Sequence, residues 1–204
     1  MQLDPIFSIA ILIVSVIIHE VSHGYAALYL GDSTAQYAGR LSLNPVKHLD
    51  PIGSIIVPFV LSLIPPHIVF GWAKPVPVNP YNLRDQRWGE VLVAAAGPLS
   101  NLVIALIFGL LIRFNSADPF LSAPFLHIAA MLVLINLLLA VFNLVPIPPL
   151  DGSKIFFGLL PERFYAFKEW FTRNYLMVFL FFVFFVWQFV NPLVFFLFRL
   201  VTGA

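Results

Sequence analysis

The sequence predicts a polytopic helical membrane protein, and two observations carry that prediction. Of its 204 residues, 60% are hydrophobic and only 10% are charged, and the mean hydropathy is +0.94. A typical soluble domain is about 45–50% apolar and about 25% charged. In addition, four runs are apolar over the roughly 17–25 residues that a helix needs to cross a bilayer. We therefore expect the bilayer to surround most of the chain.

The apolar runs give the order of the expected elements. Four spanning helices are expected at residues 6–30, 91–112, 125–145 and 175–198. A fifth run, residues 52–64, is too short to cross, so we interpret it as a re-entrant or membrane-inserted segment. The net charge of +1 provides no basic field for nucleic acid. Without cysteine the chain has neither disulfides nor thiolate ligands.

An ionisable pattern, His19-Glu20-Val21-Ser22-His23, interrupts the first run. Histidines four residues apart on a helix project from one face and can share a metal ion, and the glutamate beside them can act as a base. The alternative is an exposed helix with incidental histidines. An apolar setting disfavours that alternative, because each unpaired buried polar group costs about 2–7 kcal/mol. The pattern therefore predicts a metal site.

A catalytic zinc ion commonly has three protein ligands and a water, so two histidines leave one ligand to find. Asp151 is the best candidate, because it follows the third of these long apolar runs, residues 125–145, in a proline-rich turn. Glu90 and Asp50 are weaker candidates. The alternative role for Asp151 is to cap a helix that begins near Gly152.

Polar residues also occur inside the second and third expected spans, residues 91–112 and 125–145. Gly97 allows helices to approach closely, and Pro98 is expected to kink or start a helix. Asn101 either bonds a neighbouring helix or donates to a substrate carbonyl. Asn136 either supports the site or packs between helices.

The region between the first two expected spanning helices is not expected to be mainly helical. Residues 36–43 are interpreted as a short strand pair, and the prolines in residues 73–80 indicate an edge strand or an extended loop. Non-helical backbone at membrane depth must be buried or line a wet cavity. His48, His67 and His127 are interpreted as loop or interfacial residues.

Three blocks together resemble the site-2 protease family of intramembrane zinc metalloproteases. They are the histidine pattern, Gly97-Pro98-Leu99-Ser100-Asn101, and the segment from Asn143 through Pro146, Pro148 and Leu150 to Asp151 and Gly152. The resemblance implies one Zn²⁺ bound by His19, His23 and Asp151, with Glu20 as general base and with Asn101 and Asn143 assisting substrate binding. It implies a single metalloprotease domain over residues 1–204, with a catalytic core at about 6–160 and without PDZ or CBS domains.

The expected activity is hydrolysis of transmembrane segments of membrane protein substrates, in which Glu20 takes a proton from a metal-bound water. Two rival classes are a zinc transporter and a substrate-binding pseudoprotease. A transporter needs ionisable residues along a pathway, whereas here they cluster. A pseudoprotease does not need Glu20.

Basic residues give the expected orientation. If residues 52–64 do not cross, nine lie on one side and two on the other: Arg40, Lys47, Lys74, Arg84, Arg87, Lys154, Arg163, Lys168 and Arg173 against Arg113 and Arg199. The positive-inside rule then places the site at the cytoplasmic face, and we expect a prokaryotic inner membrane. Finally, a substrate helix must unwind to be cut, and the alternation in residues 40–43 suggests that residues 39–43 form a strand that pairs with it.

Overall fold

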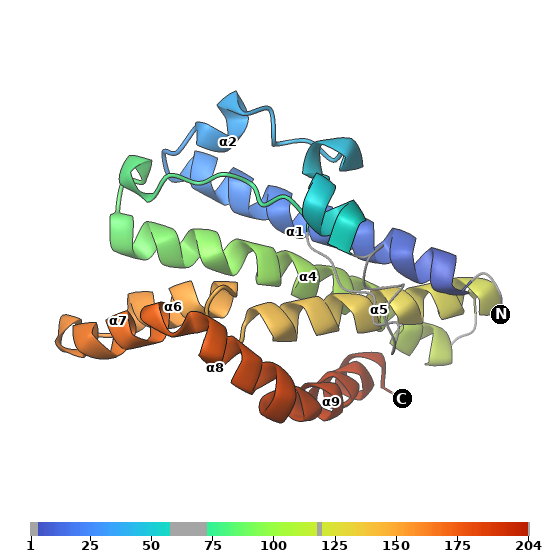
Figure 1. The fold of residues 1–204 in the computed structure, drawn as a ribbon. Coiled ribbons are helices and arrows are strands. Elements are labelled where there is room, and N and C mark those ends of the chain that lie inside the picture. The colour runs from blue at the N-terminus through green and yellow to red at the C-terminus, as the bar shows by residue number, and fades with distance from the viewer. Residues whose placement is uncertain (1–3, 58–72, 118–119, 204) are drawn as a thin grey trace.

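A computed structural model describes residues 4–57, 73–117 and 120–203, and the described residues are mainly helical (Figure 1). The α-helices are α1 (Asp4–Tyr29), α2 (Thr34–Tyr37), α4 (Gln86–Ala117), α5 (Ala123–Asn143), α6 (Asp151–Leu159), α7 (Tyr165–Arg173), α8 (Tyr175–Phe181) and α9 (Val190–Thr202). The short 3₁₀ and π turns are η1 (Pro45–His48), η2 (Pro51–Ile56), η3 (Pro80–Asn82), η4 (Glu162–Phe164), η5 (Phe182–Val186) and η6 (Trp187–Phe189).

Three long helices, α1, α4 and α5, lie side by side and pack against one another (Figure 1). The short helix α6 packs on α4, and α9 packs on α5 and α4. A core of apolar residues fills the contact between α4, α5 and the C-terminal helices, with Val133, Leu137 and Phe182 at its centre. This frame holds the polar residues of α1 against α4.

Four helical segments are long and apolar enough to cross a membrane: Ile6–Tyr29, Gln86–Asn115, Ala123–Asn143 and Tyr175–Thr202. The four spans expected from the sequence are thereby confirmed. Their outer surfaces fit lipid, because on α1 Ile9 and Ile13 are exposed while Ser15 and His19 are buried. A helix with its apolar residues outside and its polar residues inside is stable in a bilayer, where polar groups must find partners within the protein.

The last span is not one regular helix. The chain passes from α8 through the π turn η5 and the 3₁₀ turn η6 into α9 (Figure 1). Pro192 is the third residue of α9 and has no backbone N–H to give to the carbonyl four residues earlier. A missing helical bond of this kind is a common cause of a break in a helix, which the apolar pattern alone does not reveal.

The prediction of short β-strands is wrong for the described residues, in which no strand is formed. Gln36 lies in α2, and the chain turns at Gly39 with a φ of +63°. Arg40 donates its backbone N–H to Ala35 O, and its guanidinium bonds the carbonyl of Lys74 at 2.6 Å. The alternation in residues 40–43 therefore belongs to an anchored turn. The strand at residues 39–43 that was expected to pair with the substrate is not formed.

Residues 73–79 form an extended segment, as the prolines predicted, and it returns to the end of α1. The backbone N–H of Lys74 donates to His48 O (2.9 Å), and that of Asn79 donates to the buried carboxylate of Asp32 (2.7 Å). Arg84 N bonds Leu30 O. The two flanks of the fifth apolar run thus lie on one side of the bundle. Most of that run, from residue 58 on, lies outside the described residues.

Pro98 lies in the interior of α4, so the helix does not begin there as one reading of the sequence allowed. The side chain of Pro98 is fully buried. Its neighbour Gly97 faces α1, which brings α4 against the histidine pattern.

Candidate metal centre

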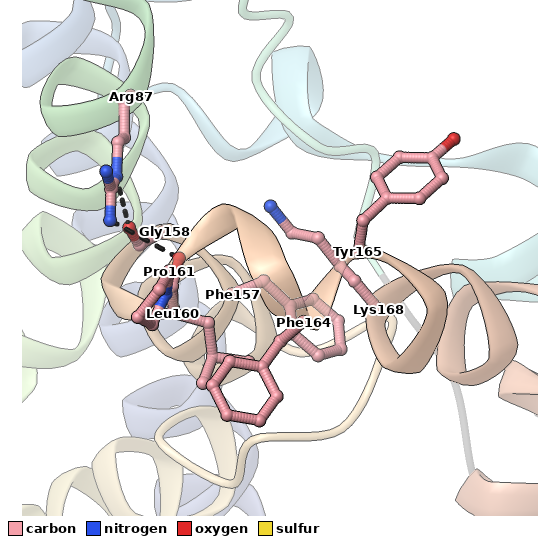
Figure 2. Close-up of a pocket in the computed structure, with 8 residues that line it drawn as sticks. All are labelled: Arg87, Phe157, Gly158, Leu160, Pro161, Phe164, Tyr165 and Lys168. Atoms are coloured by element: carbon pink, nitrogen blue, oxygen red, sulfur yellow. Dashed lines mark hydrogen bonds between the residues drawn. The ribbon is translucent and has the colours of Figure 1, made fainter.

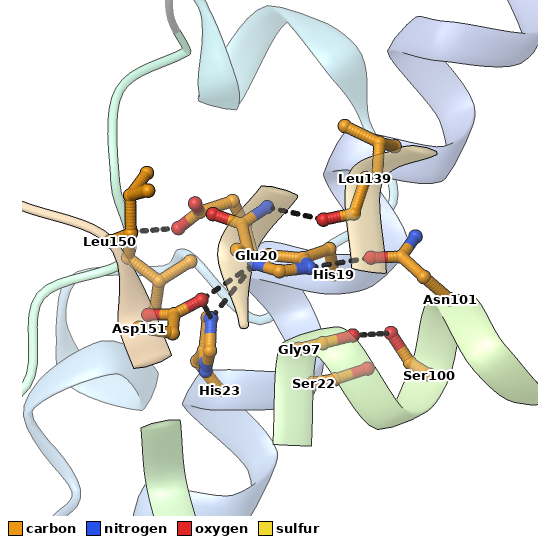
Figure 3. A network of polar contacts seen from close by, with 12 residues as sticks. His19, Glu20, Ser22, His23, Gly97, Ser100, Asn101, Leu139, Leu150 and Asp151 are labelled. Carbon is orange, nitrogen blue, oxygen red and sulfur yellow. Dashed lines mark hydrogen bonds and ion pairs between the residues drawn. The ribbon is translucent and has the colours of Figure 1, made fainter. Parts of the chain in front are cut away.

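His19, His23 and Asp151 meet at one point between α1 and α6 (Figure 3). The Nε2 atoms of the two histidines are 3.0 Å apart, and Oδ2 of Asp151 lies 3.1 Å from each of them. The histidines project from successive turns of α1, and Asp151 is the first residue of α6. The N-cap position belongs to Leu150, so the carboxylate of Asp151 faces the imidazoles and does not cap its own helix.

The other ring nitrogen of each histidine has its own acceptor. Nδ1 of His23 lies 2.7 Å from Val93 O, and because a carbonyl can only accept, His23 donates from Nδ1. Nδ1 of His19 lies 2.6 Å from Oδ1 of Asn101. Each bond fixes the tautomer in which Nε2 carries a lone pair. The two lone pairs and a carboxylate oxygen then point at one place, as in a metal site oriented by outer hydrogen bonds.

This donor set fits zinc. Zinc–nitrogen bonds of about 2.0–2.1 Å place tetrahedral ligand atoms about 3.3–3.4 Å apart, close to the separations of 3.0–3.1 Å found here. Burial would raise the pKa of Asp151, but when His19 and His23 carry protons on Nε2 their hydrogen bonds and charge hold it well below its usual range. The carboxylate is therefore ionised, as metal binding requires. Metal binding would release those protons and leave each Nε2 with its lone pair.

Gly97 leaves the space that such an ion needs. A Cβ built at this position would lie 2.6 Å from Nε2 of His19 and closer still to Nε2 of His23. The sequence suggested only that Gly97 allows helices to approach. Its more specific role is to keep side-chain atoms of α4 away from the ligand nitrogens.

A buried amide network stands behind His19. Nδ2 of Asn101 donates to Oδ1 of Asn136 (2.9 Å), and Nδ2 of Asn136 donates to Oγ of Ser15 (2.9 Å). Asn101 and Asn136 are fully buried, and Ser15 is 1% exposed. The network joins α1, α4 and α5, so that the orientation of one imidazole depends on all three long helices.

A cavity of about 390 Å³ opens beside the three candidate ligands. Glu20 lines it, and its Oε2 accepts a hydrogen bond from Val76 N (2.9 Å) in the extended segment. Asn143 also lines the cavity, whereas Asn101 does not. The two asparagines that the resemblance grouped together thus occupy different places.

The weaker ligand candidates lie elsewhere. Glu90 is exposed on the cavity wall, outside the group of ligand atoms. Asp50 accepts bonds from the backbone of Ile52 and Gly53 at the start of η2. His48 is buried in its loop, with Nε2 2.7 Å from Ser42 O. His67 lies outside the described residues.

Comparison with known proteins adds independent evidence. The profile of peptidase family M50 matches residues 116–187, which include Asp151. YwhC of Bacillus subtilis is 43% identical over 155 residues, covering 74% of this chain and 67% of its own. The chain belongs to peptidase family M50. This M50 protein is also 32% identical to MJ0611 of Methanocaldococcus jannaschii over 163 residues (74% of this chain, 73% of that one). It is 33% identical to Rip2 of Mycolicibacterium smegmatis over 141 residues (69% and 52%).

Each of these three relatives carries the name "Putative zinc metalloprotease". The chain spans about half the length of Rip2. No solved structure matches the chain. Family membership makes this protein a hydrolase that acts on peptide bonds, and the relatives' names imply zinc. Together with its four apolar helices, membership also makes it an integral membrane protein.

Sequence reasoning overlooked Ser15 and Val76 and left Asn136 open between two roles. A signal for Ser15 was present, because it precedes His19 by four residues and therefore lies on the same helical face. Asn136 likewise precedes Asn143 by two helical turns. Val76 carried no such signal, since its backbone N–H, and not its side chain, bonds Glu20.

Proposed function

We propose that this M50 protein is a zinc endopeptidase that cuts transmembrane segments of membrane proteins. One observation carries the proposal: three candidate zinc ligands converge beside a glutamate, in a cavity at the end of a membrane-spanning helix. His19, His23 and Asp151 hold one Zn²⁺ per chain, and Glu20 is the general base. A zinc transporter is not favoured, because the described histidines and carboxylates that could bind zinc form one group and no pathway.

Zinc, when bound, supplies a Lewis acid that polarises a water molecule and the substrate carbonyl. Glu20 accepts a proton from that water while the water oxygen forms a bond to the carbonyl carbon. Glu20 then returns the proton to the amide nitrogen as the carbon–nitrogen bond breaks. The bond from Val76 N holds the Glu20 carboxylate at the cavity wall. Asn143 lines the same cavity, which supports a role in donating a hydrogen bond to the peptide.

The substrate is a transmembrane helix that unwinds locally before it is cut. A helical peptide hides its carbonyls in hydrogen bonds along its axis, which keeps them from an attacking water. Unwinding in a bilayer costs several kcal/mol for each unpaired group, so a cavity with polar walls supports it. Glu90 and Lys154 provide polar walls here.

The site faces the cytoplasm in a prokaryotic inner membrane. Two observations support this orientation: the bias of nine basic residues against two, and the backbone bonds that return residues 74–84 to the end of α1. Those bonds support the interpretation that residues 52–64 do not cross the membrane. Under that interpretation the nine basic residues share one side, which the positive-inside rule makes cytoplasmic.

The decisive experiment measures metal and cleavage together. Purified protein in detergent is analysed for bound zinc and incubated with a single-pass membrane protein, beside its Glu20→Gln and Asp151→Ala forms. We expect one zinc per chain and cleavage in the parent. Glu20→Gln should keep zinc and lose cleavage, and Asp151→Ala should lose both. Cleavage by Glu20→Gln at the parent rate would refute the role of Glu20, and full zinc in Asp151→Ala would remove that ligand.

A further inference from the structure

A second cavity, of about 530 Å³, lies between the start of α4 and the corner where α6 leads into α7 (Figure 2). It shares no lining residue with the cavity at the metal centre. Its charged lining residues are Arg87 and Lys168, and Tyr165 also lines it, with its hydroxyl directed away from both cations (Figure 2). The rings of Phe157 and Phe164 form an apolar wall, with the Lys168 side chain extending past them (Figure 2). No carboxylate belongs to the described lining.

The two positive charges are held differently. Arg87 donates from Nε to Gly158 O (2.7 Å) and from Nη2 to Leu160 O (3.3 Å), which fixes its guanidinium at the last turn of α6. The Lys168 ammonium lies 6.0 Å from the centre of the Phe157 ring. Neither interaction supplies a negative charge. An anion in the cavity would be attracted by both cations and could accept hydrogen bonds from the lysine.

The position of this cavity relative to the membrane indicates where the anion comes from. Arg87 is the second residue of α4, at the edge of a membrane-spanning segment. Two spans, Gln86–Asn115 and Ala123–Asn143, separate the start of α4 from α6 and α7, and the next span starts only at Tyr175. The helix α7 therefore lies on the same side of the membrane as the start of α4. Phe167 and Trp170 of α7 are both nearly half exposed, beside charged Lys168. Such a helix is typical of those that lie in the interface of a bilayer.

We propose that this cavity binds the phosphate headgroup of an anionic glycerophospholipid. Lys168 and Arg87 attract the phosphate. The rings of Phe157 and Phe164 contact the glycerol and the first methylenes of the chains. A free phosphate ion has the same charged group but nothing to place against those rings, and the exposed apolar residues of α7 favour a lipid. Lipid binding at this cavity does not depend on proteolysis at the metal centre.

The test uses the full-length protein in nanodiscs that contain equal parts of phosphatidylcholine and phosphatidylglycerol. Lipids that stay bound after release from the disc are counted by native mass spectrometry. Phosphatidylglycerol should be enriched over phosphatidylcholine in the parent. Lys168→Gln should reduce that enrichment roughly fivefold, the equivalent of about 1 kcal/mol for one basic residue near an anionic surface.

The matched control is Arg173→Gln. It removes the same charge from the last turn of the same helix, but Arg173 does not line this cavity. It should keep the enrichment, and circular dichroism should show that both variants are folded. Three results would overturn the proposal: equal enrichment in Lys168→Gln and the parent, equal loss in both variants, or no preference for phosphatidylglycerol in the parent. Displacement of the lipid by millimolar inorganic phosphate would overturn the lipid source and indicate a site for free anions.

Discussion

Replacing Asn101 by leucine should weaken zinc binding without touching a ligand. Leucine has a similar size, but it removes the acceptor for His19 Nδ1 and the donor for Asn136 Oδ1. Both partners are almost fully buried, so each is left without a hydrogen bond at a cost of about 1–3 kcal/mol. Loss of an outer hydrogen bond to a ligating histidine typically lowers metal affinity by about 10–100-fold, or roughly 1.4–2.7 kcal/mol. The cost at His19 alone, about 1–3 kcal/mol, agrees with this range of zinc affinity.

The assay is competition for zinc between the purified protein and a chelator of known affinity. Ser100→Ala is the control, because Ser100 is the neighbouring residue in α4 and its hydroxyl bonds Gly97 O of its own helix. It should bind zinc as the parent does. Asn143→Ala should also keep its zinc, since Asn143 lines the cavity and bonds Leu139 O of its own helix, but it should cleave more slowly. A zinc affinity of Asn101→Leu within twofold of the parent value would refute the positioning role.

Three further predictions follow from contacts outside the ligands. Gly97→Ala should abolish zinc binding, measured by metal analysis, because its methyl group would press on both ligand nitrogens. Val76→Pro removes the N–H that bonds Glu20, so kcat should fall at least tenfold in a cleavage assay with zinc content unchanged. The pKa of Asp32 is lowered, because bonds from Thr34, Asn82 and Asn79 outweigh the opposing effect of burial. Asp32 should therefore stabilise the parent relative to Asp32→Asn above pH 3.8, its ordinary pKa, and this advantage should shrink at lower pH in thermal unfolding.

The sequence was informative wherever one helix or one apolar run decided the structure. The spacing of His19 and His23 fixes them on one face of a helix, and the lengths of the runs fix four spans. Asp151 was found because few carboxylates stand at the end of an apolar run. The structure places it against the two histidines, more than a hundred residues away in the chain.

The sequence was uninformative where function depends on packing between helices. Asn101 could equally have faced a substrate or a neighbouring helix, and only the register of α4 against α1 turns its Oδ1 toward His19. The predicted strands failed for a related reason. Residues 40–43 alternate as a strand does, but no other segment pairs with them in the described chain, and the Arg40 guanidinium bonds two backbone carbonyls instead.

The short helix α6 connects the two sites. Asp151 begins it at the metal centre, and the carbonyls at its other end are held by Arg87 from the first turn of α4. Close contact with α4 leaves little freedom, because a Cβ at Gly158 would collide with Val91. The candidate ligand Asp151 is therefore positioned by a nine-residue helix, in an otherwise proline-rich connection. A lipid headgroup bound by Lys168 and Arg87 would contact the residues that hold the end of α6, the helix that carries Asp151. The effect of lipid composition on zinc retention can therefore be measured in the same nanodiscs.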